Sequence, residues 1–390
     1  MVLRTIAVIA AILLASTHGL GMLSLEQDSG RAFEDGALAA SSTFAAGREV
    51  VGNERPDQPA PDSVDGLLDR IFARIEAQQL DAALDLTEEL VQRYPKHRLG
   101  HLIKGDLLSA QMQSIDGFGA AQAPAERIAE LRAEALVRLN SYRQRPPVGH
   151  VPRNLIKMTP EQGHAVVVDT SRSRLYLFRN DGVLPRLVAD YYVTQGELGT
   201  DKFREGDKKT PLGVYRVNRT VPKDQLIDLY GSAAFTLNYP NAWDRQRGRG
   251  GSGIWLHGTQ SDTFARPPLA SKGCIALTNP DISAVSAYLQ DGVTPVIISD
   301  QIEWVSKSEW QRERDVLVGL LDAWRTDDKN AALGIDADKL SIFRNPGKDE
   351  VLVVNFEQQV RGGAGTSSQK KVQYWMREAG SWKIVHEGQA

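Results

Sequence analysis

Hydrophobic positions change their spacing along this chain, and the changes divide it into three structured regions. From about Ser63 apolar residues recur every three or four positions, the period of an amphipathic helix. Between about 150 and 300 the period shortens to two, which is typical of β-strands. From 304 onward a long helical pattern is followed by strand patterns. We therefore predict a multidomain α+β protein with a helical module, a mainly-β domain and a C-terminal α+β domain.

The helical module is predicted to span residues 63–145. Its second helix ends near Tyr94-Pro95, because proline cannot continue a helix. A third helix is expected from 98 to 111 and a fourth from 124 to 142, with Gly117-Phe118-Gly119 as the break between them. One face of the first helix carries Val64, Leu67, Leu68, Ile71 and Ile75. The first helix–turn–helix resembles one tetratricopeptide-like unit, and we expect it to serve packing or homodimerisation rather than chemistry.

The mainly-β domain is predicted for residues 150–300. Asn180-Asp181-Gly182 has the composition of a hairpin turn, and a short helix is expected from about Asn279 to Gln290. The predicted strands are His164–Thr170, Arg174–Phe178, Leu187–Thr194, Gly213–Val217, Gly253–His257 and Thr294–Ile298.

The last domain, residues 304–390, is predicted to pack one helix against an antiparallel sheet. The helix should run from Ser306 to Lys329, and the strands are expected at Glu350–Gln358, Gln369–Arg377 and Trp382–Glu387. Its aromatic residues are expected in the core, with a ligand pocket as the alternative; they are Tyr374, Trp375 and Trp382.

The N-terminal residues indicate export. Arg4 is followed by an almost unbroken apolar stretch from Thr5 to Ser16, which fits a signal peptide and is too short for an ordinary membrane span. The candidate signal-peptidase sites are not ideal. An uncleaved inner-membrane tether formed by residues 1–24 is therefore the alternative. Residues 25–62 are rich in Gly, Ala, Ser, Asp and Pro and are expected to form a flexible linker. We expect an exported protein of the periplasm or cell envelope.

Charge and cysteine content narrow the function classes. The formal net charge is −3 and no sustained basic stripe is present, so we expect no nucleic acid partner. The chain has one cysteine, Cys274. A single cysteine excludes an intramolecular disulfide, and one thiol makes a zinc site unfavourable. We expect no metal and no cofactor, and we expect this free thiol to be reactive.

A histidine stands in an apolar run upstream of the cysteine, at His257. A thiolate nucleophile needs a base and donors for the oxyanion that forms after attack. His257 can be the base, and the backbone N–H groups of Gly273 and Cys274 can be the donors, because glycine allows a sharp turn. We assign Ser271 as an orienting hydroxyl and Gly258 to substrate binding. The alternative is a buried free cysteine and a satisfied core histidine.

These residues resemble the signature of the L,D-transpeptidase catalytic domain, also called the YkuD domain. That signature is a histidine and, after an intervening loop, a Ser or Thr followed by His-Gly-Cys; His257, Ser271, Gly273 and Cys274 match it. Thr210-Pro211-Leu212-Gly213 resembles a second family segment, and the resemblance covers about 150 of 390 residues. It implies a cysteine enzyme acting on peptidoglycan stem peptides. Such enzymes attack the carbonyl of the third residue, expel the terminal D-residue and hold an acyl-enzyme.

Two positions depart from the family pattern. Lys272 replaces the usual histidine, and Ala276 stands where an arginine often follows the cysteine. Lys272 is expected to stabilise the thiolate or meet a substrate carboxylate, with a solvated loop lysine as the alternative. The Ser-Lys-Gly-Cys form with a C-terminal helix and sheet is similar to the helical cell-shape L,D-carboxypeptidases. In those proteins the last domain resembles the nuclear transport factor 2 fold, which we expect here.

Three arginines precede the His257 strand on a glycine-rich loop: Arg245, Arg247 and Arg249. We assign them to the binding of stem-peptide carboxylates, with solvated loop charge as the alternative. The leading functional expectation is peptidoglycan L,D-transpeptidation. The alternatives are L,D-carboxypeptidation, which trims tetrapeptide to tripeptide stems, and a non-catalytic peptidoglycan-binding protein. A pure binder needs neither Cys274 nor His257, which argues against the last alternative.

Overall fold

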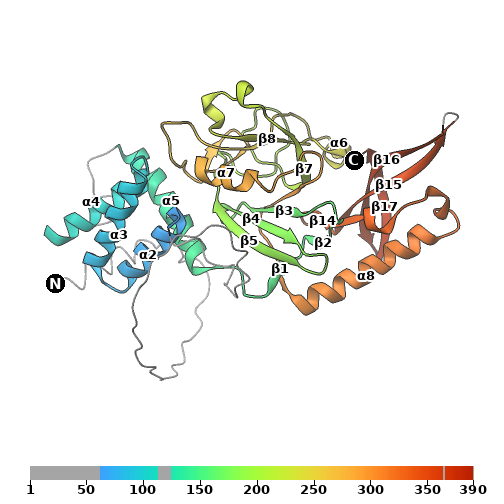
Figure 1. Cartoon of the computed structure of the whole chain (residues 1–390), viewed down its shortest axis with the longest axis horizontal. Coiled ribbons are helices and arrows are strands. Elements are labelled where there is room, and N and C mark those ends of the chain that lie inside the picture. Colours follow the sequence, from blue (N-terminus) through green and yellow to red (C-terminus); the bar gives the residue numbers. More distant parts are fainter. Residues whose placement is uncertain (1–61, 113–123, 363–364, 390) are drawn as a thin grey trace, which may run out of the picture.

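The computed structural model describes residues 62–112, 124–362 and 365–389. The expected signal or anchor segment 1–24, the linker up to residue 61 and the break at 117–119 lie outside these ranges. Within them, no helix combines the length and the apolar character needed to span a membrane. Figure 1 shows a group of helices on the N-terminal side, a curved sheet in the middle, and a second sheet with a long helix at the C-terminal side. The prediction of a multidomain α+β protein is confirmed.

Four helices form the helical module between residues 64 and 143 of the described chain: α2 (Val64–Glu76), α3 (Leu80–Arg93), α4 (Arg98–Met112) and α5 (Ala125–Arg143). The Ser63 side chain caps α2 by accepting a hydrogen bond from the Gly66 N–H at 3.1 Å, which satisfies one free donor of the first turn. The apolar stripes of the helices meet in a buried core that includes Leu67, Ile71 and Leu90. These helices agree with the predicted ones. The tetratricopeptide likeness remains a prediction.

The central domain is built on a mixed sheet with the strand order β11-β9-β8-β7-β12-β3-β4-β5. β12 pairs parallel with β3 and antiparallel with β7, so the sheet is neither purely parallel nor purely antiparallel. Helix α7 (Asn279–Ser286) packs against it through Ile282 and Val285. The strands are β3 (His164–Asp169), β4 (Arg174–Asn180), β5 (Pro185–Tyr192), β7 (Gly213–Thr220), β8 (Ala234–Leu237), β9 (Trp255–His257), β11 (Ile275–Ala276) and β12 (Pro295–Ser299).

Strand β3 is buried on both faces, which explains its run of β-branched residues. Val166 and Val168 face one core together with Leu256. Ala165 and Val167 belong to a second core that they share with aromatic residues of the C-terminal sheet. The C-terminal domain therefore covers one face of the central sheet.

The C-terminal sheet has the order β17-β16-β15-β14-β2, with helix α8 (Lys307–Thr326) packed on it. Its edge strand β2 (Leu155–Lys157) comes from the start of the central region, and the Trp310 indole N–H donates to the Leu155 carbonyl at 2.6 Å. A short pair, β1 (His150–Pro152) with β13 (Trp304–Ser306), also joins the two regions. The other strands are β14 (Ser341–Arg344), β15 (Val351–Gly362), β16 (Gly365–Glu378) and β17 (Ser381–Gln389).

The aromatic residues of the last domain lie mainly in its core, as predicted. Tyr374 and Trp375 are buried, and Trp382 packs against the same apolar cluster as Trp375. Tyr374 also lines a cavity of about 730 Å³ between the C-terminal sheet and the central domain. Of the three aromatic residues, Tyr374 is therefore the one that lines a cavity, as the alternative of a ligand pocket requires. The likeness to nuclear transport factor 2 remains a prediction.

Candidate active site

Cys274 and His257 lie on the same face of two adjacent strands. β11 runs parallel to β9, with Ile275 opposite Leu256 and Ala276 opposite His257. Leu256 and Ile275 point into the central core, so the alternating neighbours point to the other face. Cys274 immediately precedes β11, and His257 is therefore its diagonal neighbour across the strand pair.

The sulfur of Cys274 is held by the backbone of the segment before β9. Its Sγ donates to the Gly253 carbonyl at 3.3 Å, and the Trp255 backbone N–H forms a hydrogen bond with the same sulfur. Burial raises the pKa of the Cys274 thiol above its ordinary value, and the Trp255 N–H, Arg266 and Lys202 act in the opposite direction. The thiol form is therefore the resting form at neutral pH.

His257 is fixed in one tautomer. Its side chain is buried, and Nδ1 lies 2.6 Å from the Gly258 carbonyl, which can only accept, so Nδ1 carries the proton and Nε2 is left as the base. Burial lowers the pKa of His257 to about 4; the Gly258 hydrogen bond opposes this shift and Arg266 adds to it. The Tyr230 ring stands edge-on to the imidazole, with 5.1 Å between ring centroids. A neutral imidazole at pH 7 is a competent proton acceptor.

Gly258, assigned from the sequence to substrate binding, has a structural role beside the histidine, and its contact with substrate stays a prediction. A Cβ at this position would lie 2.2 Å from Asn279 Oδ1, so only glycine fits. The Gly258 N–H donates to the Tyr230 carbonyl at 2.9 Å, and its own carbonyl accepts from His257.

The Ser271–Cys274 turn brings the two predicted oxyanion donors together, but one of them, the Gly273 N–H, is already engaged in a hydrogen bond within the turn. Gly273 has a φ of 120°, and a Cβ there would lie 2.7 Å from the Lys209 carbonyl, which explains the glycine. The Gly273 N–H already donates to Ser271 Oγ at 3.0 Å, and Ser271 Oγ donates to the Cys274 carbonyl at 2.6 Å. The Cys274 N–H has no hydrogen-bond partner in the described part of the chain. Ser271 thus orients the turn, and Cys274 is the amide free to meet an oxyanion.

The second family-like segment also supports this turn. Thr210 is buried, and its hydroxyl donates to the Gly273 carbonyl at 3.0 Å while accepting from the Gly196 N–H at 2.9 Å. This threonine fixes the peptide that precedes the nucleophile.

The three loop arginines do not converge on Cys274. Arg245, on α6 (Ala242–Gln246), lines the cavity beside the C-terminal sheet, and Cys274 is not among the residues lining that cavity. Arg247 forms an ion pair with Asp349 of the C-terminal domain at 2.8 Å. Arg249 pairs with Asp201 at 2.7 Å. Arg245 Nη1 donates to the Pro240 carbonyl, so each arginine has a structural contact of its own.

Lys272 is exposed on the turn before Cys274, and its ammonium has no carboxylate partner among the described residues. Its stabilisation of the thiolate or contact with a substrate carboxylate, and the alternative of a solvated loop lysine, stay predictions. In the same ranges no three His, Cys, Asp or Glu side chains gather as a metal site.

Sequence reasoning missed Arg266, Tyr230 and Trp255. Arg266 acts electrostatically on both Cys274 and His257, although it lies in an irregular loop with no periodic pattern. The rings of Tyr230 and Trp255 pack together, with centroids 4.5 Å apart, on the face that carries His257. Alternation along β9 could have placed Trp255 on this face; nothing in the sequence pattern marks the other two.

The comparisons with known proteins agree with this geometry. The family model of the L,D-transpeptidase catalytic domain (YkuD) matches residues 163–298, which include Cys274 and His257. Two curated relatives, both described as putative L,D-transpeptidase YafK, come from Escherichia coli strains K12 and O157:H7. Each is 34% identical over 117 residues, which are 30% of this chain and 42% of the relative. The chain thus spans less than half the length of the curated relatives it matches.

Among solved structures, Bd1075 from Bdellovibrio bacteriovorus is similar with a TM-score of 0.51 and 25% identity. The similarity covers 62% of this chain and 98% of that one. The helical cell shape determining protein Pgp2 from Campylobacter jejuni gives a TM-score of 0.49 and 21% identity over 61% of this chain and 95% of that one. On the family match over residues 163–298, the central domain of this chain is an L,D-transpeptidase catalytic domain of the YkuD family.

Proposed function

We propose that this protein is a peptidoglycan L,D-transpeptidase that works through an acyl-enzyme on Cys274. The observation that carries the proposal is the pairing of β9 with β11, which sets Cys274 and His257 on one face of the sheet. The match of residues 163–298 to the YkuD domain supplies the substrate class, the stem peptides of peptidoglycan.

The reaction begins from a neutral thiol–imidazole pair. As Cys274 Sγ attacks the carbonyl carbon of the third stem residue, its proton passes to His257 Nε2, and the Cys274 N–H meets the oxyanion. Collapse of the tetrahedral species breaks the amide bond, and the leaving amine of the D-residue takes the proton from His257. A thioester remains on Cys274. The amine of a second stem then loses a proton to His257, attacks the thioester and releases the thiol.

One observation favours L,D-carboxypeptidation as the second candidate. Two loops near Cys274 are tied to other parts of the fold. In the segment that leads to Gly253, whose carbonyl accepts from Cys274 Sγ, Arg249 pairs with Asp201 and the Gly250 N–H donates to the Phe203 carbonyl at 2.9 Å. In the loop that carries Arg266, Phe264 packs against the helical module. Loops fastened in this way resist the opening that a second stem would require, which favours water as the group that hydrolyses the thioester.

Incubation with purified tetrapeptide muropeptides, followed by mass spectrometry, tests both candidates. Transpeptidation predicts cross-linked products, or products with an exchanged D-amino acid when that amino acid is in excess. Tripeptides alone under excess acceptor would replace the first candidate by the second. Unchanged tetrapeptides with the wild-type chain would contradict both candidates and leave the non-catalytic wall-binding alternative. Equal turnover by Cys274→Ala would contradict the acyl-enzyme on Cys274 and indicate another nucleophile.

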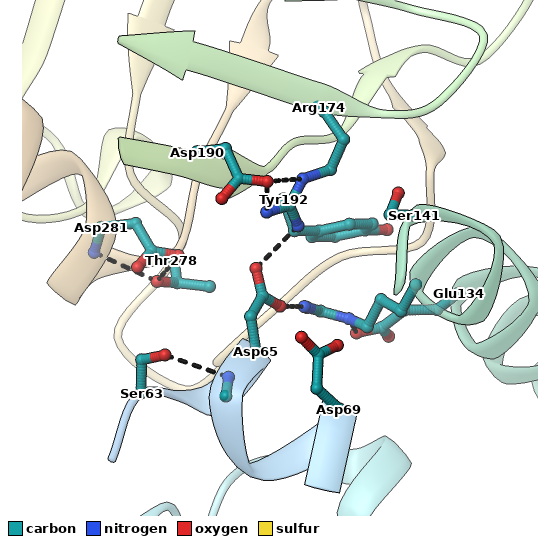
Figure 2. Close-up of polar contacts among 12 residues, drawn as sticks. Ser63, Asp65, Asp69, Glu134, Ser141, Arg174, Asp190, Tyr192, Thr278 and Asp281 are labelled. Atoms are coloured by element: carbon teal, nitrogen blue, oxygen red, sulfur yellow. Dashed lines mark hydrogen bonds and ion pairs between the residues drawn. The ribbon is translucent and has the colours of Figure 1, made fainter. Parts of the chain in front are cut away.

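Export and a cell-envelope location are part of the proposal, since its substrate is extracytoplasmic. An inner-membrane tether through residues 1–24 is the form of attachment that we propose to test, by fractionation of cells that carry the full chain. The helical module contacts the central domain of its own chain, as Figure 2 shows, which supports its packing role more directly than homodimerisation.

A further inference from the structure

Arg266 is a half-buried cation beside the reacting groups. It lies in the loop between β9 and β10 (Leu269–Ser271), and burial lowers the pKa of its guanidinium. Its Nη2 donates to the Leu229 carbonyl at 3.3 Å, and among the described residues no carboxylate lies within ion-pair distance. Its charge acts on both the Cys274 thiol and the His257 imidazole. Leu229 directly precedes Tyr230, whose ring centroid lies 5.1 Å from that of His257, so the contact with Leu229 holds the guanidinium on the side of the reacting pair, with donors left free.

Three neighbouring cations have carboxylate partners, and Lys272, which has none among the described residues, is exposed to solvent, whereas Arg266 is half-buried. Lys202 also acts on Cys274, but its ammonium is buried against Asp207 at 2.7 Å. Arg249 pairs with Asp201, and Lys208 pairs with Glu197. Partial burial of a guanidinium without a carboxylate costs free energy, so a cation of this kind in an active site points to an anionic ligand.

The loop that carries Arg266 is fastened to the helical module. The Phe264 ring packs against Tyr94 and His97, with centroid distances of 5.1 and 5.3 Å. Lys96 Nζ donates to the Ser261 carbonyl at 2.7 Å. Inside the loop, Thr259 Oγ1 donates to the Thr263 carbonyl at 2.8 Å. The segment that precedes Arg266 is therefore held both by contacts with the helical module and by a hydrogen bond of its own.

Tyr192 links Arg266 to the same module. Its hydroxyl donates to the Arg266 carbonyl at 2.8 Å, and the Arg138 guanidinium of α5 lies over its ring, 3.9 Å from the centroid. Arg138 in turn is paired with Asp65 of α2, which also binds Arg174 of β4 at 2.7 Å (Figure 2). The backbone of Arg266 is thus held by side chains that the helical module fixes.

We propose that Arg266 binds the free α-carboxylate of the terminal residue that the enzyme expels, and that the helical module holds Arg266 in place for it. This inference rests on the proposed function. The α-carboxylate carbon of the leaving residue is two bonds from the scissile amide nitrogen, so a guanidinium beside the nucleophile meets it directly. A charge-assisted pair between guanidinium and carboxylate then replaces the lost solvation of Arg266. The enzyme selects stems that end at the expelled residue and rejects stems without that free carboxylate, whichever acceptor follows.

Two substrates test the proposal: a tetrapeptide muropeptide with a free terminal carboxylate and the same compound as a terminal carboxamide. Wild type should prefer the acid by about 10- to 100-fold in kcat/KM, the range for a hydrogen bond to a charged group. Arg266→Gln should lose that preference, because the acid slows by about 10- to 100-fold more than the amide does. Arg266→Lys should keep part of it. Arg219→Gln, an exposed arginine on β7, is the matched control and should leave the preference intact.

Binding to Cys274→Ala separates this inference from the proposed function. Calorimetry should show tighter binding of the acid than of the amide, and the added Arg266→Gln change should remove the difference. Equal binding of acid and amide to Cys274→Ala overturns the role of Arg266, whether or not the wild type turns over either substrate. An equal loss on both substrates in Arg266→Gln also overturns it, because that pattern indicates an effect on the thiol. Absence of turnover with the binding preference present contradicts the proposed function alone. Circular dichroism of each variant checks that it is folded.

Discussion

Replacing His257 by alanine should make acylation strongly dependent on pH. Burial raises the pKa of the Cys274 thiol and lowers that of His257 to about 4, so the resting pair is neutral. With an ordinary thiol pKa of about 8.5, less than about 3% of Cys274 is thiolate at pH 7. The attack at pH 7 therefore needs the imidazole, and His257→Ala should lower the acylation rate by about 10²- to 10⁴-fold.

The deficit should shrink as pH rises, because direct ionisation then replaces the base. The thiolate fraction of the variant grows about tenfold per pH unit below the thiol pKa. The wild type should keep its activity at low pH. The pKa of His257, lowered to about 4, keeps the base neutral down to that pH, and activity is lost only below it.

The assay is the rate of Cys274 alkylation by iodoacetamide, followed by intact mass from pH 5 to 10, together with acylation by a carbapenem. His150→Ala on β1 is the matched control and should follow the wild-type profile. A wild-type alkylation rate that is already high and flat between pH 5 and 7 would refute the neutral pair. That profile would indicate a preformed thiolate–imidazolium pair.

Three further changes test other parts of the structure. Cys274→Ala should abolish turnover and carbapenem adducts while leaving the circular dichroism spectrum unchanged; an adduct in that variant would contradict the assigned nucleophile. Asp65→Asn should lower the free energy of unfolding by about 3 kcal/mol in urea titrations. This is the low end of the range for a broken buried ion pair, because the Asp65 side chain remains 17% exposed. Asp85→Asn, at an exposed position, is the control and should change the free energy of unfolding by less than about 0.5 kcal/mol. Tyr192→Phe removes the 2.8 Å hydrogen bond to the Arg266 carbonyl and should lower kcat/KM for the acid tetrapeptide by about 3- to 10-fold, without changing the rate of Cys274 alkylation by iodoacetamide. Equal kcat/KM values for the variant and the wild type on the acid tetrapeptide would show that this hydrogen bond does not position Arg266.

The longer elements could be predicted from the sequence because their periods extend over many residues. The helices at 64–143 and 307–326, and strands such as β3 and β15, show their pattern directly. β11 has two residues, too few for any period, and its place beside β9 is set by long-range pairing. β2 was missed for a similar reason, since three residues before the central sheet pair with a strand almost 200 positions later.

The site could be predicted only as far as its motif. Cys274 and His257 stand out because few residue types perform their chemistry. The partners of Arg247 and Arg249 could not be inferred, because Asp349 and Asp201 are brought close only by the fold. The engagement of the Gly273 amide by Ser271 depends on the detailed turn geometry, which spacing does not fix.

The treatment of buried charge differs between two places in this protein, and the difference bears on function. At the contact between helical module and central domain, Asp65 pairs with Arg138. Asp65 also binds Arg174, which in turn binds Asp190 at 2.5 Å (Figure 2). These charges compensate one another, as burial requires. Arg266 lacks such compensation within the described residues, although its loop is anchored to the same module. This contrast is what the proposed role of Arg266 predicts, with the carboxylate of the substrate as the missing partner of the guanidinium. On this argument the helical module contributes to substrate selection, although none of its residues needs to touch the peptide.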